Sequence, residues 1–153
     1  RDSRRIMCEY KVTADDLVDN AKFDDRIAVL KLFPGITPAV VKAVLQTPDL
    51  QGVVIETYGS GNAPTEKWFI DALGDAIDRG IIVMNVTQCK AGAVQMRQYA
   101  ASCDMDRIGV VSGHDITIEA AVAKMMYLLG QYPENKESVK EKLEISLRGE
   151  LTD

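Results

Sequence analysis

The sequence predicts an α/β domain: a three-layer sandwich, of the Rossmann-like or flavodoxin-like kind, in which helices cover both faces of a four-stranded parallel sheet. Short apolar runs of the length of buried strands alternate four times with amphipathic helical segments along the chain. The connections between them are short, so right-handed crossovers between successive strands give one parallel sheet. The chain has 153 residues, of which 46% are hydrophobic, and this is enough apolar material for the core of one domain.

The first 25 residues are expected to be an interdomain linker or a loosely attached arm, and residues 26–153 to be the domain. The stretch before residue 26 is polar, carries several aspartates between Asp15 and Asp25, and shows little alternation of apolar and polar residues. The first strand of the predicted sheet follows it directly.

The first half of the domain predicts two strand–helix units. The apolar run at 27–33 is typical of a buried parallel strand. Thr37 then offers an N-cap, and Pro38 suits the first turn of a helix. A second buried strand at 53–55 precedes a helix that Gly80 is placed to end. The residues expected on the apolar faces of the two helices are Val40, Val41, Val44, Leu45, Phe69, Ala72, Leu73, Ala76 and Ile77.

The second half predicts the remaining strands and helices. We expect strands at 81–84 and 108–111 and helices at about 94–103 and 135–145. Between the last strand and the last helix, Asp115 can cap a further amphipathic helix, and Gly130 is expected to end it.

Charge and cysteine content exclude several classes of function. The net charge is −5, with 23 acidic and 18 basic side chains spread along the chain, which argues against a nucleic-acid partner. No apolar run approaches the roughly 18 residues of a membrane span, so no membrane partner is expected. Three widely spaced cysteines indicate neither a disulfide framework nor a zinc site, and a single histidine excludes a site with three imidazole ligands. We therefore expect no metal site, and the absence of a secretory signal from this sequence favours a cytoplasmic location.

Four loops are expected to compete for function, because ligands of open parallel sheets gather outside the carboxyl ends of the strands, near the switch in strand order. These loops are residues 33–36, 56–64, 87–92 and 112–115.

The loop at 56–64 is the richest of the four in polar and flexible residues. Gly59 and Gly61 permit positive φ or a close approach of the backbone to a ligand. Asn62 can cap the following helix, contact a polar ligand, or do both. The third glycine of a dinucleotide-binding fingerprint is missing, because position 64 is proline.

The loops at 87–92 and 112–115 offer no pair of catalytic groups. Cys89 is expected near a helix N-terminus, where the pKa of a thiol can fall, but no histidine lies near it in sequence to act as a base. His114 and Asp115 are adjacent, so their side chains should diverge rather than form a dyad. These residues alone predict a binding rim without catalytic residues.

Six segments, taken in order, resemble the C-terminal domain of type I, cytosolic asparaginases. They span the chain from about residue 25 onward and are LKLFPG (30–35), ETYGSGNAP (56–64), DRGI (78–81), NVTQC (85–89), GHDITIEAA (113–121) and LRGEL (147–151). The resemblance implies a two-domain, cofactor-free amidohydrolase that converts L-asparagine to L-aspartate and ammonia, commonly as a homo-oligomer. It also implies that the catalytic threonines belong to an N-terminal domain outside this sequence, which would be this chain's partner.

The resemblance also implies which residues face a ligand or an interface. Asn62 matches an asparagine that helps to complete an active site between subunits, and Cys89 matches a cysteine at an activating asparagine site of some bacterial members. Glu56 departs from such a regulated member, which has arginine there, and an acidic group would repel a substrate carboxylate. The expected ligand-binding or interface residues are Tyr58, Gly59, Gly61, Asn62, Thr87, Cys89, His114 and Asp115. The alternative is a non-catalytic α/β module that uses the same loops for regulation or assembly.

Overall fold

The computed structural model describes residues 22–89, 92–94 and 100–152. Most of the predicted N-terminal arm, including Cys8, lies outside the described residues. The last part of the arm runs along a helix, since the backbone amide of Asp24 donates to the carbonyl of Met126 at 2.9 Å and the rings of Phe23 and Tyr127 lie 6.0 Å apart.

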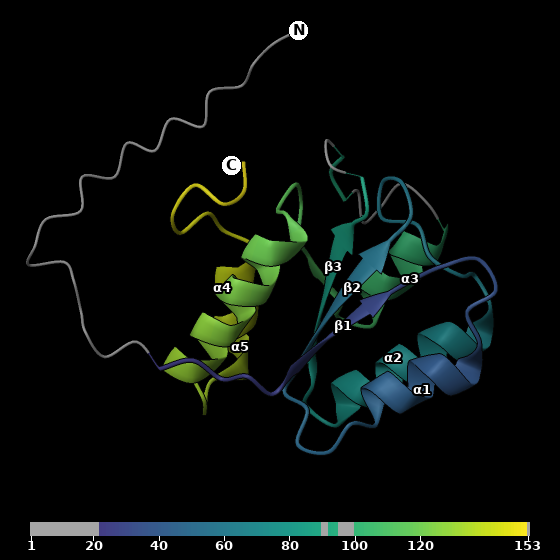
Figure 1. Cartoon of the computed structure of the whole chain (residues 1–153), viewed down its shortest axis with the longest axis horizontal. Coiled ribbons are helices and arrows are strands. Elements are labelled where there is room, and N and C mark those ends of the chain that lie inside the picture. The colour runs from purple at the N-terminus through teal and green to yellow at the C-terminus, as the bar shows by residue number, and fades with distance from the viewer. Residues whose placement is uncertain (1–21, 90–91, 95–99, 153) are drawn as a thin grey trace, which may run out of the picture.

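The predicted four-stranded parallel sheet is confirmed (Figure 1). Its strands lie in the order β1-β2-β3-β4. Their bounds are β1 Ile27–Lys31, β2 Gly52–Thr57, β3 Ile82–Thr87 and β4 Val111–Ser112. The last strand is shorter than predicted and begins where the apolar run at 108–111 ends.

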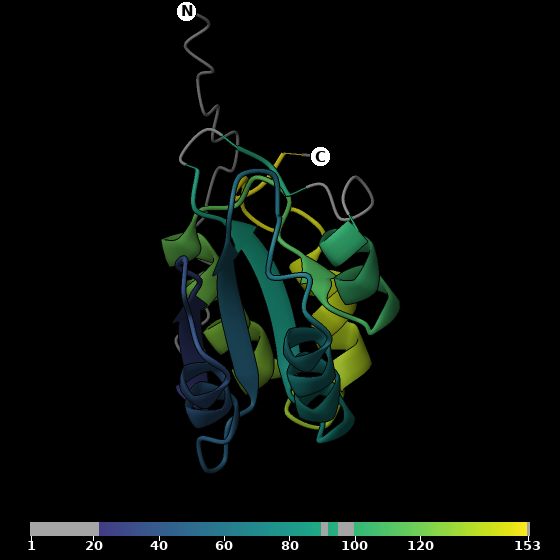
Figure 2. The same cartoon turned by 90° about the vertical axis from the view of Figure 1, so that its right-hand side faces the viewer.

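Helices cover both faces of the sheet, as predicted (Figure 2). Three helices follow the first three strands, namely α1 Pro38–Leu45, α2 Lys67–Asp78 and α3 Ala100–Arg107. Buried residues of these three helices belong to one core cluster. The other face is covered by α4 Ile118–Gln131 and α5 Lys136–Leu143, whose buried residues form a second cluster.

The order of the four described strands never reverses, so the expected switch in strand order is not among them. Right-handed crossovers between consecutive neighbours put every connecting helix on one face. The second face is covered only because the chain continues beyond β4 and packs α4 and α5 against it. The loops at the carboxyl ends of the strands therefore lie in a row along that end of the sheet. They do not surround the crevice that forms where two neighbouring crossovers go to opposite faces of a sheet.

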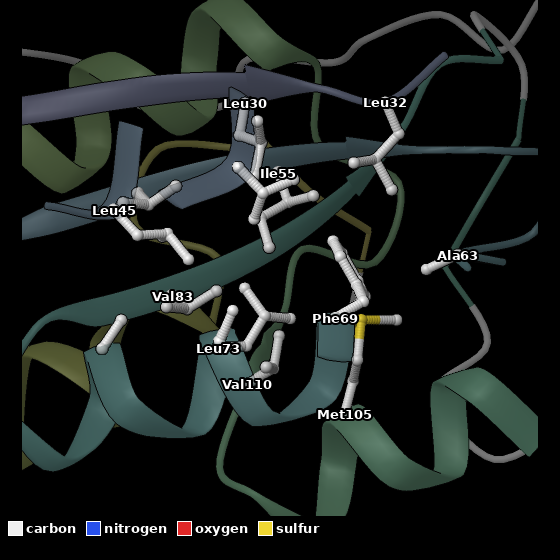
Figure 3. Close-up of a cluster of buried hydrophobic side chains, with 14 of the residues drawn as sticks. Leu30, Leu32, Leu45, Ile55, Ala63, Phe69, Leu73, Val83, Met105 and Val110 are labelled. Atoms are coloured by element: carbon white, nitrogen blue, oxygen red, sulfur yellow. The ribbon is translucent and has the colours of Figure 1, made fainter. Parts of the chain in front are cut away.

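The two cores follow from the alternation of side chains along each strand. Leu30, Ile55 and Val83 point toward α1 and α2, where they meet Phe69 and Leu73 (Figure 3). Val54, Ile82 and Met84 point to the opposite face and pack against α4 and α5. Both sides of the central strands are thus buried, which accounts for their continuous apolar runs.

Several predicted helix ends are wrong. The N-cap of α4 is Thr117, whose hydroxyl accepts from the amide of Ala120 at 3.3 Å, and not Asp115. Gly130 lies inside α4 rather than beyond its end. Asn62 is not a cap either, because α2 begins at Lys67 after Glu66.

Two further details of the helices differ from expectation, and one agrees. Thr37 occupies the N-cap position of α1 without a side-chain cap bond, and Val40 is exposed rather than packed. Gly80 adopts φ +86° just beyond α2, as predicted for a residue that ends a helix. Within the described residues, no helix is both long enough and apolar enough to span a bilayer.

Candidate functional site

The candidate site is the set of loops at the carboxyl ends of the strands, here called the rim: residues 33–36, 56–64, 87–89, 92–94 and 112–115. Figure 2 shows these loops together at the end of the sheet to which the strand arrows point. The chain's last described residues reach the same end.

The loop after β2 is a compact turn. The backbones of Tyr58 and Asn62 exchange two hydrogen bonds of 2.8 Å, and the amide of Gly61 donates to the carbonyl of Tyr58 at 3.0 Å. Gly59 and Gly61 have φ values of +49° and +99°, the left-handed region that favours glycine. Burial raises the pKa of Tyr58 above its ordinary value.

Asn62 stands exposed on this turn. Its side-chain oxygen accepts from the amide of Ala63 at 3.0 Å, and Ala63 is buried in the core beneath. The residue predicted to meet a ligand is therefore fixed at its base and presented at the surface.

Gly61 is also the point where this loop meets the next one. A Cβ at this position would lie 2.8 Å from Cγ1 of Val94, closer than real side chains pack. Gly61 is therefore required both by its φ and by the close approach of the segment 92–94.

Beneath the rim, two fully buried polar side chains join β2 to β3. The Oγ1 of Thr57 lies 2.6 Å from Oδ1 of Asn85 and 3.1 Å from the carbonyl of Val86. Nδ2 of Asn85 donates to the carbonyl of Gly61 at 3.4 Å. Buried polar groups are costly unless they are paired, so this pair holds the turn above it in one position.

Two further side chains tie the loops together. The hydroxyl of Thr87 donates to the carbonyl of Gly59. Nε2 of Gln88 donates to the carbonyls of Leu32 and Glu56, at 2.7 and 2.9 Å. Of these linking residues, Thr87 was identified from the sequence, whereas Thr57, Asn85 and Gln88 were missed. A polar residue inside an otherwise apolar run was an available signal for Asn85, whereas Thr57 follows Glu56 at the end of its strand and gave no such signal.

Glu56 is paired rather than isolated. Its Oε1 lies 3.3 Å from Nζ of Lys31 on the neighbouring strand. The expectation that a bare acidic group would repel a carboxylate at this position therefore needs revision, since an exposed cation stands beside it.

Cys89 is exposed, and its backbone amide donates to Oγ1 of Thr87 at 3.0 Å. The carbonyl of Cys89 accepts from the amide of Gly92 at 2.9 Å. The described part of α3 begins only at Ala100, which does not place Cys89 at a helix N-terminus.

His114 adopts φ +50° and is one of two non-glycine residues with positive φ in the described part of the chain. Its amide donates to Oγ of Ser112 at 3.2 Å, and its carbonyl accepts from the amide of Val94 at 2.8 Å. The amide of Gly113 in turn donates to the carbonyl of Asn85 at 2.8 Å. The loop after β4 is thus connected to β3 and to the segment 92–94 that follows β3.

Asp115 does not form a dyad with His114. Its carboxylate accepts from the amide of Thr152 at 2.8 Å and from the hydroxyl of the same residue. Burial alone would raise the pKa of Asp115, but these hydrogen bonds outweigh it and lower the pKa. Asp115 therefore links the rim to the end of the chain.

The described rim presents polar groups but no assembled catalytic pair. No hydrogen bond within the described residues joins the His114 ring to a hydroxyl or a thiol. Over the same ranges, no three His, Cys, Asp or Glu side chains lie close enough to hold a metal ion. Amides, hydroxyls and one exposed lysine suit the recognition of a small polar molecule.

Comparisons with known proteins agree with the resemblance. The family described as Glutaminase/Asparaginase C-terminal domain matches residues 26–142. L-asparaginase 1 of Escherichia coli is 41% identical over 126 residues, which are 82% of this chain and 37% of that protein. The human 60 kDa lysophospholipase is 46% identical over 136 residues, which are 89% of this chain and 23% of that protein. The chain thus spans about a quarter to two fifths of the length of these relatives.

Solved structures give the same result. The structure of L-asparaginase I of Vibrio cholerae superposes on this chain with a TM-score of 0.76 at 42% identity. The match covers 85% of this chain and 39% of the Vibrio chain. The thermostable L-asparaginase of Thermococcus kodakarensis superposes with a TM-score of 0.77 at 28% identity.

Proposed function

Because this chain belongs to the glutaminase/asparaginase C-terminal domain family, we propose that it is the C-terminal part of an amidohydrolase that converts L-asparagine and water to L-aspartate and ammonia. The reacting threonines would lie in an N-terminal domain, its partner in the same protein. The proposal needs no metal or cofactor.

The observation that carries this proposal is a rim whose described residues present fixed polar groups and include no assembled catalytic pair. Thr57 and Asn85 fix its central turn from below, and Asn62 is presented at the surface above them. Burying polar side chains costs free energy unless they are hydrogen-bonded, and an edge of a sheet with a purely structural role does not need buried polar side chains. It suits one half of a site whose other half is supplied by another domain or subunit.

We propose that Tyr58, Gly59, Gly61, Asn62, Thr87, Cys89, His114 and Asp115 form this ligand-facing half. Next to it, at the end of β1, the exposed ammonium of Lys31 supplies a positive charge beside Glu56. A substrate carboxylate would meet a paired group there rather than a bare acid, which removes part of the objection to an amino-acid ligand.

The test is ammonia release from L-asparagine by two proteins: a longer protein that contains this chain, and the 153-residue chain alone. We expect ammonia release from the longer protein and none above a heat-inactivated control from the chain. L-glutamine and lysophosphatidylcholine serve as alternative substrates, the second because one relative at 46% identity is named a lysophospholipase. Ammonia release by the chain alone, or fatty-acid release without ammonia from the longer protein, would contradict the proposal.

We also propose that the longer protein is a cytoplasmic homo-oligomer. The rim is open at the surface, and a site completed across a subunit interface requires a second copy. Size exclusion with light scattering separates the cases, since a dimer or tetramer supports a shared site and an active monomer contradicts it.

A further inference from the structure

The segment after α5 returns to the rim and ends beside the loop that follows β4 (Figures 1 and 2). We call residues 146–152 the C-terminal strap. Leu151 is buried in the core cluster that α4 and α5 form with the sheet, and Leu147 packs against the same cluster. The strap is therefore part of the folded domain. Two sets of polar contacts, one with Lys124 and one with Asp115, hold it in place.

The first set of contacts centres on an ion pair that is largely shielded from solvent. Nζ of Lys124, whose side chain is only 5% exposed, lies 2.7 Å from Oε1 of Glu150. The same ammonium donates to the carbonyls of Leu143 and Ile145, at 3.0 and 2.6 Å. One lysine of α4 thus holds both the end of α5 and the strap, and its three donors all have acceptors.

Glu150 closes the strap's turn from the inside. Its carboxylate accepts from the amide of Leu147 at 3.0 Å and from the amide of Arg148 at 2.6 Å. A carboxylate with these partners is a strong acceptor, and the turn has one conformation as a result.

The second set of contacts is the pair of hydrogen bonds that the amide and hydroxyl of Thr152 donate to the carboxylate of Asp115. The residue before Asp115 is His114, whose φ of +50° is unfavourable for a side chain that has a Cβ. Such conformations persist where the surrounding structure enforces them, and they cluster at functional sites. The carbonyl of His114 meets the amide of Val94 on its other side.

We propose that the C-terminal strap is a positioning element of the site: through Thr152 it holds Asp115, and Asp115 keeps His114 in its left-handed conformation at the rim. Lys124 and Glu150 are positioning residues that act on His114 indirectly, because they hold the strap that carries Thr152. The effect of the strap on the conformation of the loop at 112–115 does not depend on enzyme activity. Only a contact between His114 and a ligand rests on the proposed function.

The first test uses the full 153-residue chain, in which His114 is the single histidine and gives one imidazole signal by NMR. In Thr152→Val and Asp115→Ala we expect this signal to shift and the amide of Val94 to exchange at least about tenfold faster, since its bond to His114 is loosened. Thr47→Val is the matched control, because it removes an exposed threonine hydroxyl bond at the opposite end of the sheet. It should change neither signal.

A rescue variant makes the test specific. Glycine tolerates positive φ, so in His114→Gly the loop should keep its conformation without the strap. Adding Thr152→Val to this background should then leave the exchange of Val94 unchanged. An unshifted histidine signal with unchanged exchange of Val94 in both Thr152→Val and Asp115→Ala would overturn the inference.

The second test uses the longer protein and separates the inference from the proposed function. If His114 faces the ligand, Thr152→Val should raise KM for L-asparagine several-fold and leave kcat within about twofold. An unchanged KM together with a shifted loop would support the strap as a positioning element and contradict a ligand contact for His114.

Discussion

At the scale of single residues, the partly buried carboxylate of Glu150 has a large electrostatic consequence. Burial would raise its pKa, but the Lys124 ammonium and the backbone amides that it accepts from lower the pKa to about 2. The pKa in the folded state is thus below that in the unfolded state, so the ionised group stabilises the fold.

This pKa gives a prediction for acid unfolding. The contribution of Glu150 is fully present above pH 4.5 and is lost as the pH falls toward 2. At about 1.4 kcal/mol per unit, it is on the order of 2–3 kcal/mol. Glu150→Gln should therefore be less stable than the wild type at pH 7 by roughly this amount, with the difference shrinking toward pH 2.

Urea unfolding between pH 7 and pH 2 measures the difference directly. Glu137→Gln is the matched control, because Glu137 pairs with Lys140 at 3.8 Å on the surface and should change the free energy of unfolding by under about 1 kcal/mol. Equal stability of Glu150→Gln and wild type at pH 7 would contradict the stabilising role of this carboxylate.

The residues of the site were predictable only in part. Glycines between a strand and a helix identified the turn at 58–62, because their backbone requirements are local. The link from Thr57 to Asn85 was not predicted, since it joins residues 28 positions apart and depends on the register of β2 against β3. Asp115 was assigned to a helix cap because its partner, Thr152, lies 37 positions away.

At the scale of elements, helix α4 shows how a distant segment overrides a local rule. Gly130 was predicted to end this helix, yet it lies within it. A Cβ at this position would overlap the carbonyl oxygen of Lys22. The glycine is there because the segment before β1 passes directly over the helix, and no local pattern contains that information.

This contact predicts opposite effects for two substitutions of the same kind. Gly130→Ala should destabilise the domain or displace residues 22–25, although alanine is the better helix former. Gly74→Ala in α2 is the matched control, because a methyl group at that position would meet no other part of the described chain within 4 Å, and it should stabilise by about 0.5–1 kcal/mol.

Urea unfolding of both variants tests the prediction. The hydrogen bond from Asp24 to Met126 offers a local readout, because the exchange of the Asp24 amide should accelerate in Gly130→Ala alone. If Gly130→Ala were as stabilising as Gly74→Ala, the packing of the N-terminal segment against α4 would be refuted.

At the scale of the whole molecule, the layers were predictable and the strand order was less so. The alternation of strands and helices determines a parallel sheet, and apolar residues on both sides of β2 and β3 require helices on both faces. The sequence pattern did not reveal that the four strands run in simple succession. That order leaves α4 and α5, and with them the strap, to cover the second face and return to the rim.

We interpret the rim as one half of a site. Its binding groups are fixed by buried hydrogen bonds, and the chain spans 37% of an asparaginase relative and 23% of a lysophospholipase relative. The central claim is therefore that residues of this rim contribute to a reaction whose reacting groups lie outside the chain.

The most direct measurement of that claim is the rate of L-asparagine hydrolysis by the longer protein carrying Asn62→Ala. Asn62 is exposed, and its side-chain bond reaches only the neighbouring amide of Ala63, so the fold should survive the change. Gln46→Ala, which removes an exposed amide at the opposite end of the sheet, is the control. We predict that kcat/KM falls by at least about tenfold in Asn62→Ala and not in Gln46→Ala. Unchanged kinetics and an unchanged oligomeric state in Asn62→Ala would contradict the claim.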